Sequence, residues 1–286
     1  MVAYVSPPEK RRSFVGNKAD IKRVFKTFKR PAKKKQPIRV LAIGDSHDGP
    51  ELPDKSRFYA MGAYAKEHKV DRVIQIGDFA SMDSMSSHDP NWTKKGQAKP
   101  AFKEDVGSLL EALARLDDGL GGHKATKHIT FGNHEDRIAR FENNNPEIAE
   151  FLYEQVYELF SDFGWSYSPF GEFHFVGDVG FTHVPLNAMG KPFGGKHSEN
   201  QISNDILHDV VYGHTHKAVV KHFPKAGNEV VTVMNLGCSL PEGHVEDYAK
   251  HSITGWSYGV YDITIRDGRI RGYTWVSMEE LIERYA

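Results

Sequence analysis

The chain has 286 residues, of which 39% are hydrophobic and 26% charged, and its 37 basic and 38 acidic side chains give a net charge of −1. This composition is that of an ordinary globular protein, and no apolar run approaches the roughly 20 residues that a membrane-spanning helix needs. A single cysteine, Cys238, excludes an intrachain disulfide. We expect a cytoplasmic protein, because the N-terminus also lacks the apolar core of a secretory signal.

The basic residues are concentrated near the N-terminus. Residues 1–37 hold twelve Lys or Arg and two acids, which leaves 25 basic and 36 acidic side chains in the rest of the chain. We interpret residues 1–37 as a basic arm and residues 38–286 as the globular domain. The arm is suited to follow a nucleic-acid backbone, although a solubilising tail or docking on the acidic remainder would also fit its charge.

In the first half of the domain, apolar strands alternate with helices. Strands are expected at 38–44, 72–77 and 127–132, and helices at 56–69 and at 134–160 with an interruption near Pro146. Residues 81–102 are expected to be a long loop, either a wall of the substrate site or a surface excursion. The alternation predicts a mixed sheet covered by helices.

The second half is rich in strands. Seven strand-like segments follow one another from residue 173 to residue 276, with a hairpin turn expected at Asp267-Gly268 and a short helix at 278–285. The economical arrangement is α/β, with two sheets packed face to face and helices outside.

Side chains that bind metals follow many of these strands. They are Asp45 and His47 after the first strand, Asp78 after the second, Asn133, His134 and Glu135 after the third, and His183, His214 and His216 after later strands. His174 and His197 are nearby alternatives to His183, which is favoured because it ends the strand-like segment DVGFTH. In open α/β sheets ligands bind outside the carboxyl ends of strands, so five separated segments would deliver these groups to one edge. Each motif alone is weak, since Asn133 would also serve as a helix N-cap, but the ordered set predicts a metal centre.

The side-chain types favour a pair of divalent cations. Two cations held close together repel one another, and a bridging carboxylate, for which Asp78 is the candidate, reduces that repulsion. A net positive site can hold an anionic phosphate and produce hydroxide from water near neutral pH. Nitrogen and oxygen ligands without thiolate suit Mn²⁺, our first candidate, or Fe, Zn or Ni.

The ordered pattern D-x-H, G-D, G-N-H-E, H, G-H-x-H within residues 38–240 resembles the calcineurin-like metallophosphoesterases, and the run GNHEDRIARF more loosely resembles their bacteriophage-encoded members. The resemblance implies a four-layer α/β/β/α sandwich. It also implies one metal bound by Asp45, His47, Asp78 and His216, and a second bound by Asp78, Asn133, His183 and His214. His134 would then stabilise the transition state or protonate the leaving oxygen instead of binding metal.

The sequence departs from the family pattern in its first two motifs. Asp48 separates His47 from the usual glycine, which predicts an extra carboxylate near the metals or the substrate entrance. Ser81 stands where phosphoprotein phosphatases of the family have the aspartate that orients the catalytic histidine, with Asp83 or Glu135 as candidate replacements. No arginine follows in this segment, which argues against a phosphoprotein phosphatase because a bidentate arginine holds a dianionic phosphate there.

Together these features predict a binuclear metal-dependent phosphoesterase. In the expected reaction a metal-bridging hydroxide attacks phosphorus and His134 assists the leaving oxygen. The basic arm and the missing arginine favour a phosphodiesterase or nuclease. The alternatives are a small-molecule phosphatase, a cyclic-nucleotide phosphodiesterase, or a metal-bound scaffold that binds nucleic acid without turnover.

Overall fold

The computed structural model describes residues 36–87, 92–148, 151–227, 229–246, 249–251 and 254–286. The basic arm predicted at residues 1–37 therefore lies outside the described residues, apart from its last two. In the described part of the chain, no helix has the length and apolar character needed to cross a membrane.

Six strands form the first sheet, in the order β11-β10-β1-β2-β3-β4. They are β1 (Ile38–Ile43), β2 (Arg72–Gln75), β3 (Thr126–Thr130), β4 (Trp165–Ser168), β10 (Gly259–Arg266) and β11 (Arg269–Ser277). Strands β1 to β4 are parallel, whereas β10 and β11 are antiparallel to their neighbours, so the sheet is mixed. The β10–β11 hairpin turns at Asp267 and Gly268 as predicted, with positive φ angles of 54° and 78°.

Five strands form the second sheet, in the order β5-β6-β7-β9-β8. They are β5 (His174–Val176), β6 (Val179–Phe181), β7 (Asp209–Tyr212), β8 (Ala218–Lys225) and β9 (Glu229–Leu236). Strands β6, β7 and β9 run parallel, so this sheet is also mixed and its parallel strands end at a common edge.

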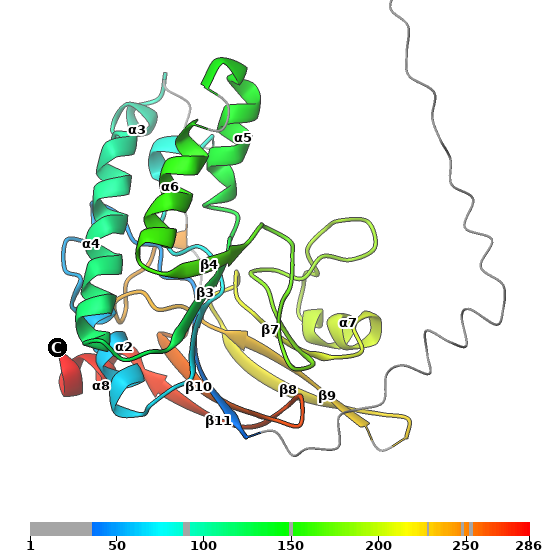
Figure 1. The fold of residues 1–286 in the computed structure, drawn as a ribbon. Helices are drawn as coiled ribbons and strands as arrows, with labels where there is room; N and C mark the ends of the chain where they lie inside the picture. The colour runs from blue at the N-terminus through cyan, green and yellow to red at the C-terminus, as the bar shows by residue number, and fades with distance from the viewer. Residues whose placement is uncertain (1–35, 88–91, 149–150, 228, 247–248, 252–253) are drawn as a thin grey trace, which may run out of the picture. The chain divides into compact units, whose positions relative to one another are not determined.

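Helices cover the outer faces of the two sheets (Figure 1). They are α2 (Ser56–Glu67), α4 (Phe102–Leu120), α6 (Phe151–Asp162) and α8 (Met278–Tyr285) on the first sheet and α7 (Ser198–Asp205) on the second; α3 (Lys94–Gln97), α5 (Asp136–Asn144) and the 3₁₀ turns η1 (Asp83–Met85) and η2 (Pro146–Ile148) lie in the connections. The predicted four-layer α/β/β/α sandwich is confirmed.

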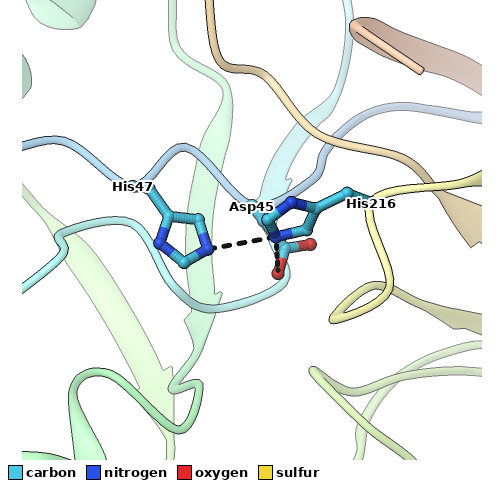
Figure 2. Close-up of side chains that lie close together, drawn as sticks. All are labelled: Asp45, His47 and His216. Carbon is cyan, nitrogen blue, oxygen red and sulfur yellow. Dashed lines mark hydrogen bonds and ion pairs between the residues drawn. The ribbon is translucent and has the colours of Figure 1, made fainter. Parts of the chain in front are cut away.

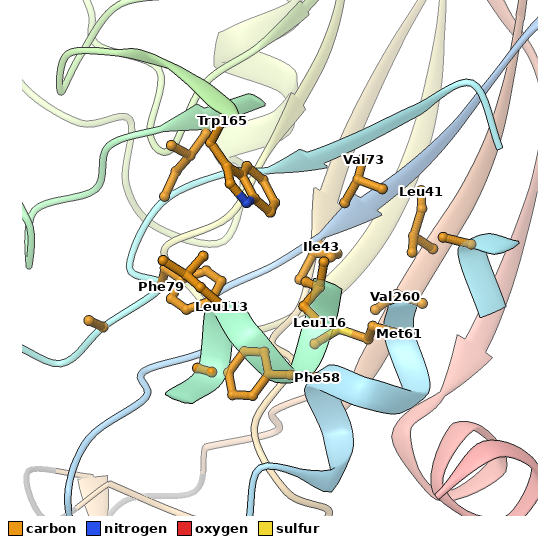
Figure 3. Packing of buried hydrophobic residues seen from close by; sticks show 14 of the residues in the cluster. Leu41, Ile43, Phe58, Met61, Val73, Phe79, Leu113, Leu116, Trp165 and Val260 are labelled. Carbon is orange, nitrogen blue, oxygen red and sulfur yellow. The ribbon is translucent and has the colours of Figure 1, made fainter. Parts of the chain in front are cut away.

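The layers follow from the alternation of side chains along β1. Leu41 and Ile43 pack against Phe58 and the other helix residues in the outer core (Figure 3), whereas Val40 and Ala42 face the core between the sheets. Alternate residues of a strand face opposite ways, so a strand that is apolar throughout serves two cores at once. This explains why residues 40–43 of β1 form an uninterrupted apolar run, VLAI.

Some elements differ from the sequence prediction. Helices α4 and α7 and strand β4 were not predicted, and the segment 81–102 contains η1 and α3 as well as loop.

Helices α2 and α4 cross at close range: a Cβ on Gly62 would lie 2.2 Å from the carbonyl oxygen of Leu116, and one on Gly119 would lie 2.1 Å from that of Tyr59. The two glycines therefore set the spacing of these helices.

Candidate metal centre

The predicted ligands follow the carboxyl ends of strands from both sheets. Asp45 follows β1, Asp78 follows β2, Asn133 follows β3 and His183 follows β6. The pair His214 and His216 follows β7. Segments that are far apart in sequence thus meet at one edge, as the strand-end argument predicts.

The backbone at this edge is strained. Among the described residues, seven non-glycine residues have positive φ, and four of them are predicted ligands: His47, Asp78, His214 and His216. Such conformations cost about 1–3 kcal/mol each and persist where the surrounding structure enforces them. Alternate residues of an extended chain face opposite ways. The positive φ angles of His214 and His216 break that alternation, so both histidines of the GHTH motif face the same cluster.

Three overlapping groups of side chains bring ligand atoms within 4.8 Å of one another. The groups are Asp45 with His47 and His216, His47 with Asp78 and His134, and Asp78 with His183 and His214. In the first group (Figure 2), Nε2 of His216 lies 3.1 Å from Nε2 of His47 and 3.5 Å from Oδ1 of Asp45. Because His47 and Asp78 are shared, the three groups form one continuous cluster.

Asp78 lies at the centre of this cluster. Its Oδ1 accepts a hydrogen bond of 2.9 Å from the backbone N–H of His134. Its Oδ2 lies 3.3 Å from Nε2 of His183 and 3.6 Å from Nε2 of His47. One carboxylate oxygen is thus fixed by the backbone while the other faces histidines of two groups, which is the position that a bridging ligand requires.

The donor set around His183 fits a cation. Its Nδ1 donates to the carbonyl oxygen of Ile76 at 2.9 Å, so in the neutral ring Nε2 carries a lone pair. That nitrogen faces Oδ1 of Asn133 at 2.9 Å, and Oδ2 of Asp78 and Nδ1 of His214 at 3.3 Å each. Lone pairs that converge in a buried site repel unless a positive charge lies between them. The residues present therefore fit a divalent metal ion.

The first group gives a second indication. Nδ1 of His47 and Nδ1 of His216 are buried and have no hydrogen-bond partner among the described residues. His47 is 2% exposed and Asp45 is fully buried, so water does not compensate these polar groups. The atoms that converge in this group are instead Nε2 of His47, Nε2 of His216 and Oδ1 of Asp45, within 3.1–3.5 Å of one another along the chain of contacts, and a bound cation would balance them.

The two carboxyl groups titrate in opposite directions. Burial, followed by the charges of Asp45 and Glu135, raises the pKa of Asp78 well above its ordinary value. Burial also acts to raise the pKa of Asp45, but the hydrogen bond and charge of His216 and the charges of His183 and His214 outweigh it and lower the value to about 2. Two close, buried carboxyl groups resist joint ionisation, and cations would remove that conflict.

The imidazoles are mainly held neutral. Burial is the largest cause of the lowered pKa values of His47, His134 and His183, and with the charge of His183 it lowers the pKa of His214 to about 4. Burial acts most strongly to lower the pKa of His216, but its hydrogen bond to Asp45 and the charges of Asp45 and Asp78 together outweigh burial and raise the pKa. Neutral imidazole is the form that binds metals.

The predicted catalytic residue, His134, has an unexpected set of partners. Its Nδ1 donates to the backbone carbonyl oxygen of Ser81 at 2.7 Å, and its Nε2 accepts a hydrogen bond of 3.1 Å from Nη2 of Arg137. Among the described residues, neither Asp83 nor Glu135, the carboxylates considered for orienting His134, makes a hydrogen bond to its ring. Arg137 is not among the residues predicted for the site, although its position three residues after His134 on a predicted helix is a usable signal.

Glu135 instead holds the two loops together. Its buried carboxylate accepts backbone N–H groups of Asp78, Phe79, Ala80 and Gly132 at 2.8–3.2 Å. These bonds tie the loop after β2 to the loop after β3, and they explain how Asp78 keeps its positive φ angle.

Asp48 is the extra carboxylate beside His47 that the motif predicts, but its burial contradicts the alternative that it lines a substrate entrance. It is 1% exposed and lies under the loop, where it accepts hydrogen bonds from Nζ of Lys55 at 2.8 Å, Nη2 of Arg57 at 2.9 Å and Oγ of Ser108 at 2.7 Å. Its charge is thus offset by two buried cations. The network links the loop that carries His47 to helices α2 and α4.

Comparisons with known proteins identify the family of the chain. The family model of the calcineurin-like phosphoesterases matches residues 38–218, and the chain therefore belongs to this family. No curated protein matches the chain. Membership, together with side-chain groups that could hold metal ions, supports a metal-dependent phosphoesterase, and the family binds a pair of divalent metals.

Three solved structures illustrate the similarity. Zinc-complexed Vps29 from Entamoeba histolytica is 15% identical, with 84% of this chain and 99% of that chain covered at a TM-score of 0.34. A protein of Thermus thermophilus, TT1561, is 10% identical, with coverages of 85% and 100% and a TM-score of 0.35. A dimetal phosphatase from Danio rerio is 10% identical, with coverages of 84% and 99% and a TM-score of 0.36.

Proposed function

We propose that the protein is a binuclear metal-dependent phosphoesterase that hydrolyses phosphodiesters. The observation that carries the proposal is the convergence of six carboxylate and imidazole ligand candidates, joined by Asn133 at His183, with Asp78 between two groups of histidines. One ion would be held by Asp45, His47, Asp78 and His216, and the other by Asp78, Asn133, His183 and His214. When bound, the two cations would polarise the phosphoryl group and acidify a water molecule.

The chain's own residues would supply the rest of the chemistry. His134 is fixed through Nδ1 by the carbonyl oxygen of Ser81, so its Nε2 is directed toward the cluster, 3.9 Å from Oδ2 of Asp78. From that position it would contact the reacting phosphate; with a proton taken up on Nε2, which then no longer accepts from Arg137, it would donate that proton to the leaving oxygen. Glu135 and Ile76 keep Asp78 and His183 in position through backbone hydrogen bonds.

The charge balance favours a diester over a monoester. Asp45, Asp78 and Glu135 are buried carboxylates, and two divalent cations would leave about one net positive charge among these groups. Arg137 adds little to this total because Asp83 pairs with it at 2.9 Å. A single positive charge matches the monoanion of a phosphodiester better than the dianion of a monoester. The twelve basic residues of the arm agree with a nucleic-acid substrate.

The test is hydrolysis of bis-p-nitrophenyl phosphate and p-nitrophenyl phosphate by metal-stripped protein resupplied with Mn²⁺. We expect cleavage of the diester that needs added metal, is lost in Asp78→Ala, and survives in Asp118→Ala, which removes an exposed carboxylate on α4. Cleavage of the monoester alone would refute the diester proposal. Turnover of neither ester, with two bound metals and with oligonucleotides also uncleaved, would point to the scaffold alternative.

A further inference from the structure

Arg137 lies at the candidate centre without being one of its predicted ligands. It belongs to the first turn of α5, and only 13% of its side chain is exposed. Its Nη1 donates to the carbonyl oxygen of Ser81 at 2.7 Å and to Oδ1 of Asp83 at 2.9 Å. Its Nη2 donates to Nε2 of His134 at 3.1 Å.

Stability does not explain this placement. A cation in the first turn of a helix is opposed by the helix dipole. The backbone N–H groups of this turn are already bonded to carbonyl oxygens, such as those of Gly132 and His134. They are therefore not free to bind an anion that would in turn balance the charge of Arg137. Asp83 is 43% exposed, and an ion pair so open to water contributes little. A nearly buried guanidinium at this point is therefore better explained by what it faces.

The guanidinium faces the reacting region in a fixed direction. The group is planar, so two acceptors on Nη1 also determine where Nη2 points. Nη2 points at Nε2 of His134, which itself lies 3.9 Å from Oδ2 of Asp78. Among the described residues, the only contacts that Arg137 makes through side-chain nitrogens use Nη1 and Nη2, which leaves Nε and one Nη2 hydrogen available to a ligand.

We propose that Arg137 is a substrate-binding residue whose Nη2 donates a hydrogen bond to a non-bridging oxygen of the phosphate ester. This inference rests on the proposed function, because it places the phosphate at the same cluster. It supplies from α5 the guanidinium that residues 78–84 lack. Asp83 and the Ser81 carbonyl orient the guanidinium, and the charge of Asp83 keeps the site suited to a monoanionic diester.

The experiment uses the full chain loaded with Mn²⁺ and compares wild type with Arg137→Ala, Arg137→Lys and Arg115→Ala. Arg115 is a matched control, because it is a 61% exposed arginine paired with Asp118 on α4. A lost charge-assisted hydrogen bond predicts that Arg137→Ala raises KM for bis-p-nitrophenyl phosphate about 10- to 100-fold and weakens binding of inorganic phosphate, measured by calorimetry, at least about 10-fold. Arg115→Ala should match wild type.

Two further readouts separate substrate binding from a structural role. Methylguanidine should restore part of the activity of Arg137→Ala but not of Arg137→Lys, whose ammonium fills the site without the planar fork. Metal content should be unchanged in both variants. The inference is overturned if Arg137→Ala keeps KM and phosphate affinity within about twofold of active wild type. A third outcome is that wild type cleaves no ester but binds inorganic phosphate, and that Arg137→Ala no longer binds it. The proposed function would then fail, while the assignment of Arg137 as an anion-binding residue would stand.

Discussion

Replacing Asp48 with alanine should destabilise the protein by about 3–5 kcal/mol, the usual result of removing one partner of a buried ion pair. Lys55 and Arg57 are only 6% and 2% exposed, and both donate to the Asp48 carboxylate. The variant leaves two cations in the interior without a counterion. It also frees the loop that carries His47.

The direction of the pKa shift indicates where this cost comes from. Burial raises the pKa of Asp48 although the charges of Arg57 and Lys55 act to lower it, so desolvation outweighs attraction. The intact network is therefore not expected to stabilise the fold more than apolar packing would. The loss comes from the unpaired cations, and Asp48→Ala combined with Lys55→Met should recover at least about 1 kcal/mol of it.

Urea unfolding followed by the fluorescence of the four tryptophans would measure these values in metal-free protein, so that metal binding does not add to stability. Asp118→Ala, whose carboxylate is 63% exposed, is the matched control and should change stability by no more than about 0.5 kcal/mol. The reasoning is refuted if Asp48→Ala lies within about 1 kcal/mol of this control.

Three more predictions follow from other buried groups. Glu135→Gln turns an amide N–H₂ toward two of the four backbone N–H groups that the carboxylate accepts, so it should cost about 2–4 kcal/mol and weaken Mn²⁺ binding in calorimetry. Gly62→Ala should destabilise by about 1–3 kcal/mol in urea because its Cβ meets the backbone of α4, whereas Gly107→Ala on α4 has open space and should stabilise by about 0.5–1 kcal/mol; equal effects would contradict the packing argument. Burial, followed by the charge of His174, lowers the pKa of His128 to about 3. The stability that neutral His128 permits above pH 6.5 is therefore lost as the pH falls, by at most about 1.4 kcal/mol per pH unit. His128→Asn should reduce this loss, measured as the difference between urea midpoints at roughly pH 7 and pH 5.

The regular elements and the ligand segments were largely predictable because their signals are local. Apolar runs that end in glycine predict β1 and β2, and polar residues directly after them predict the edge where Asp45 and Asp78 meet. Helix α4 was missed although its apolar residues recur at helical spacing, from Leu109 through Leu113 to Leu116. Short β4 carries little pattern of its own, and its place depends on pairing with β3.

The sequence by itself determined most strands and helices other than α4, α7 and β4, the α/β class and the positions of the ligand-type residues, because side-chain periodicity and strand-end position are properties of neighbouring residues. Only the tertiary structure decided which partner each polar side chain meets. Asp48 is bound by Lys55 and Ser108, and His134 is oriented by a backbone carbonyl instead of a carboxylate. Such pairings join loops and helices that are far apart in sequence. The partner of each donor depends on which acceptor lies at hydrogen-bond distance and angle in the folded chain, and no local sequence pattern encodes that geometry.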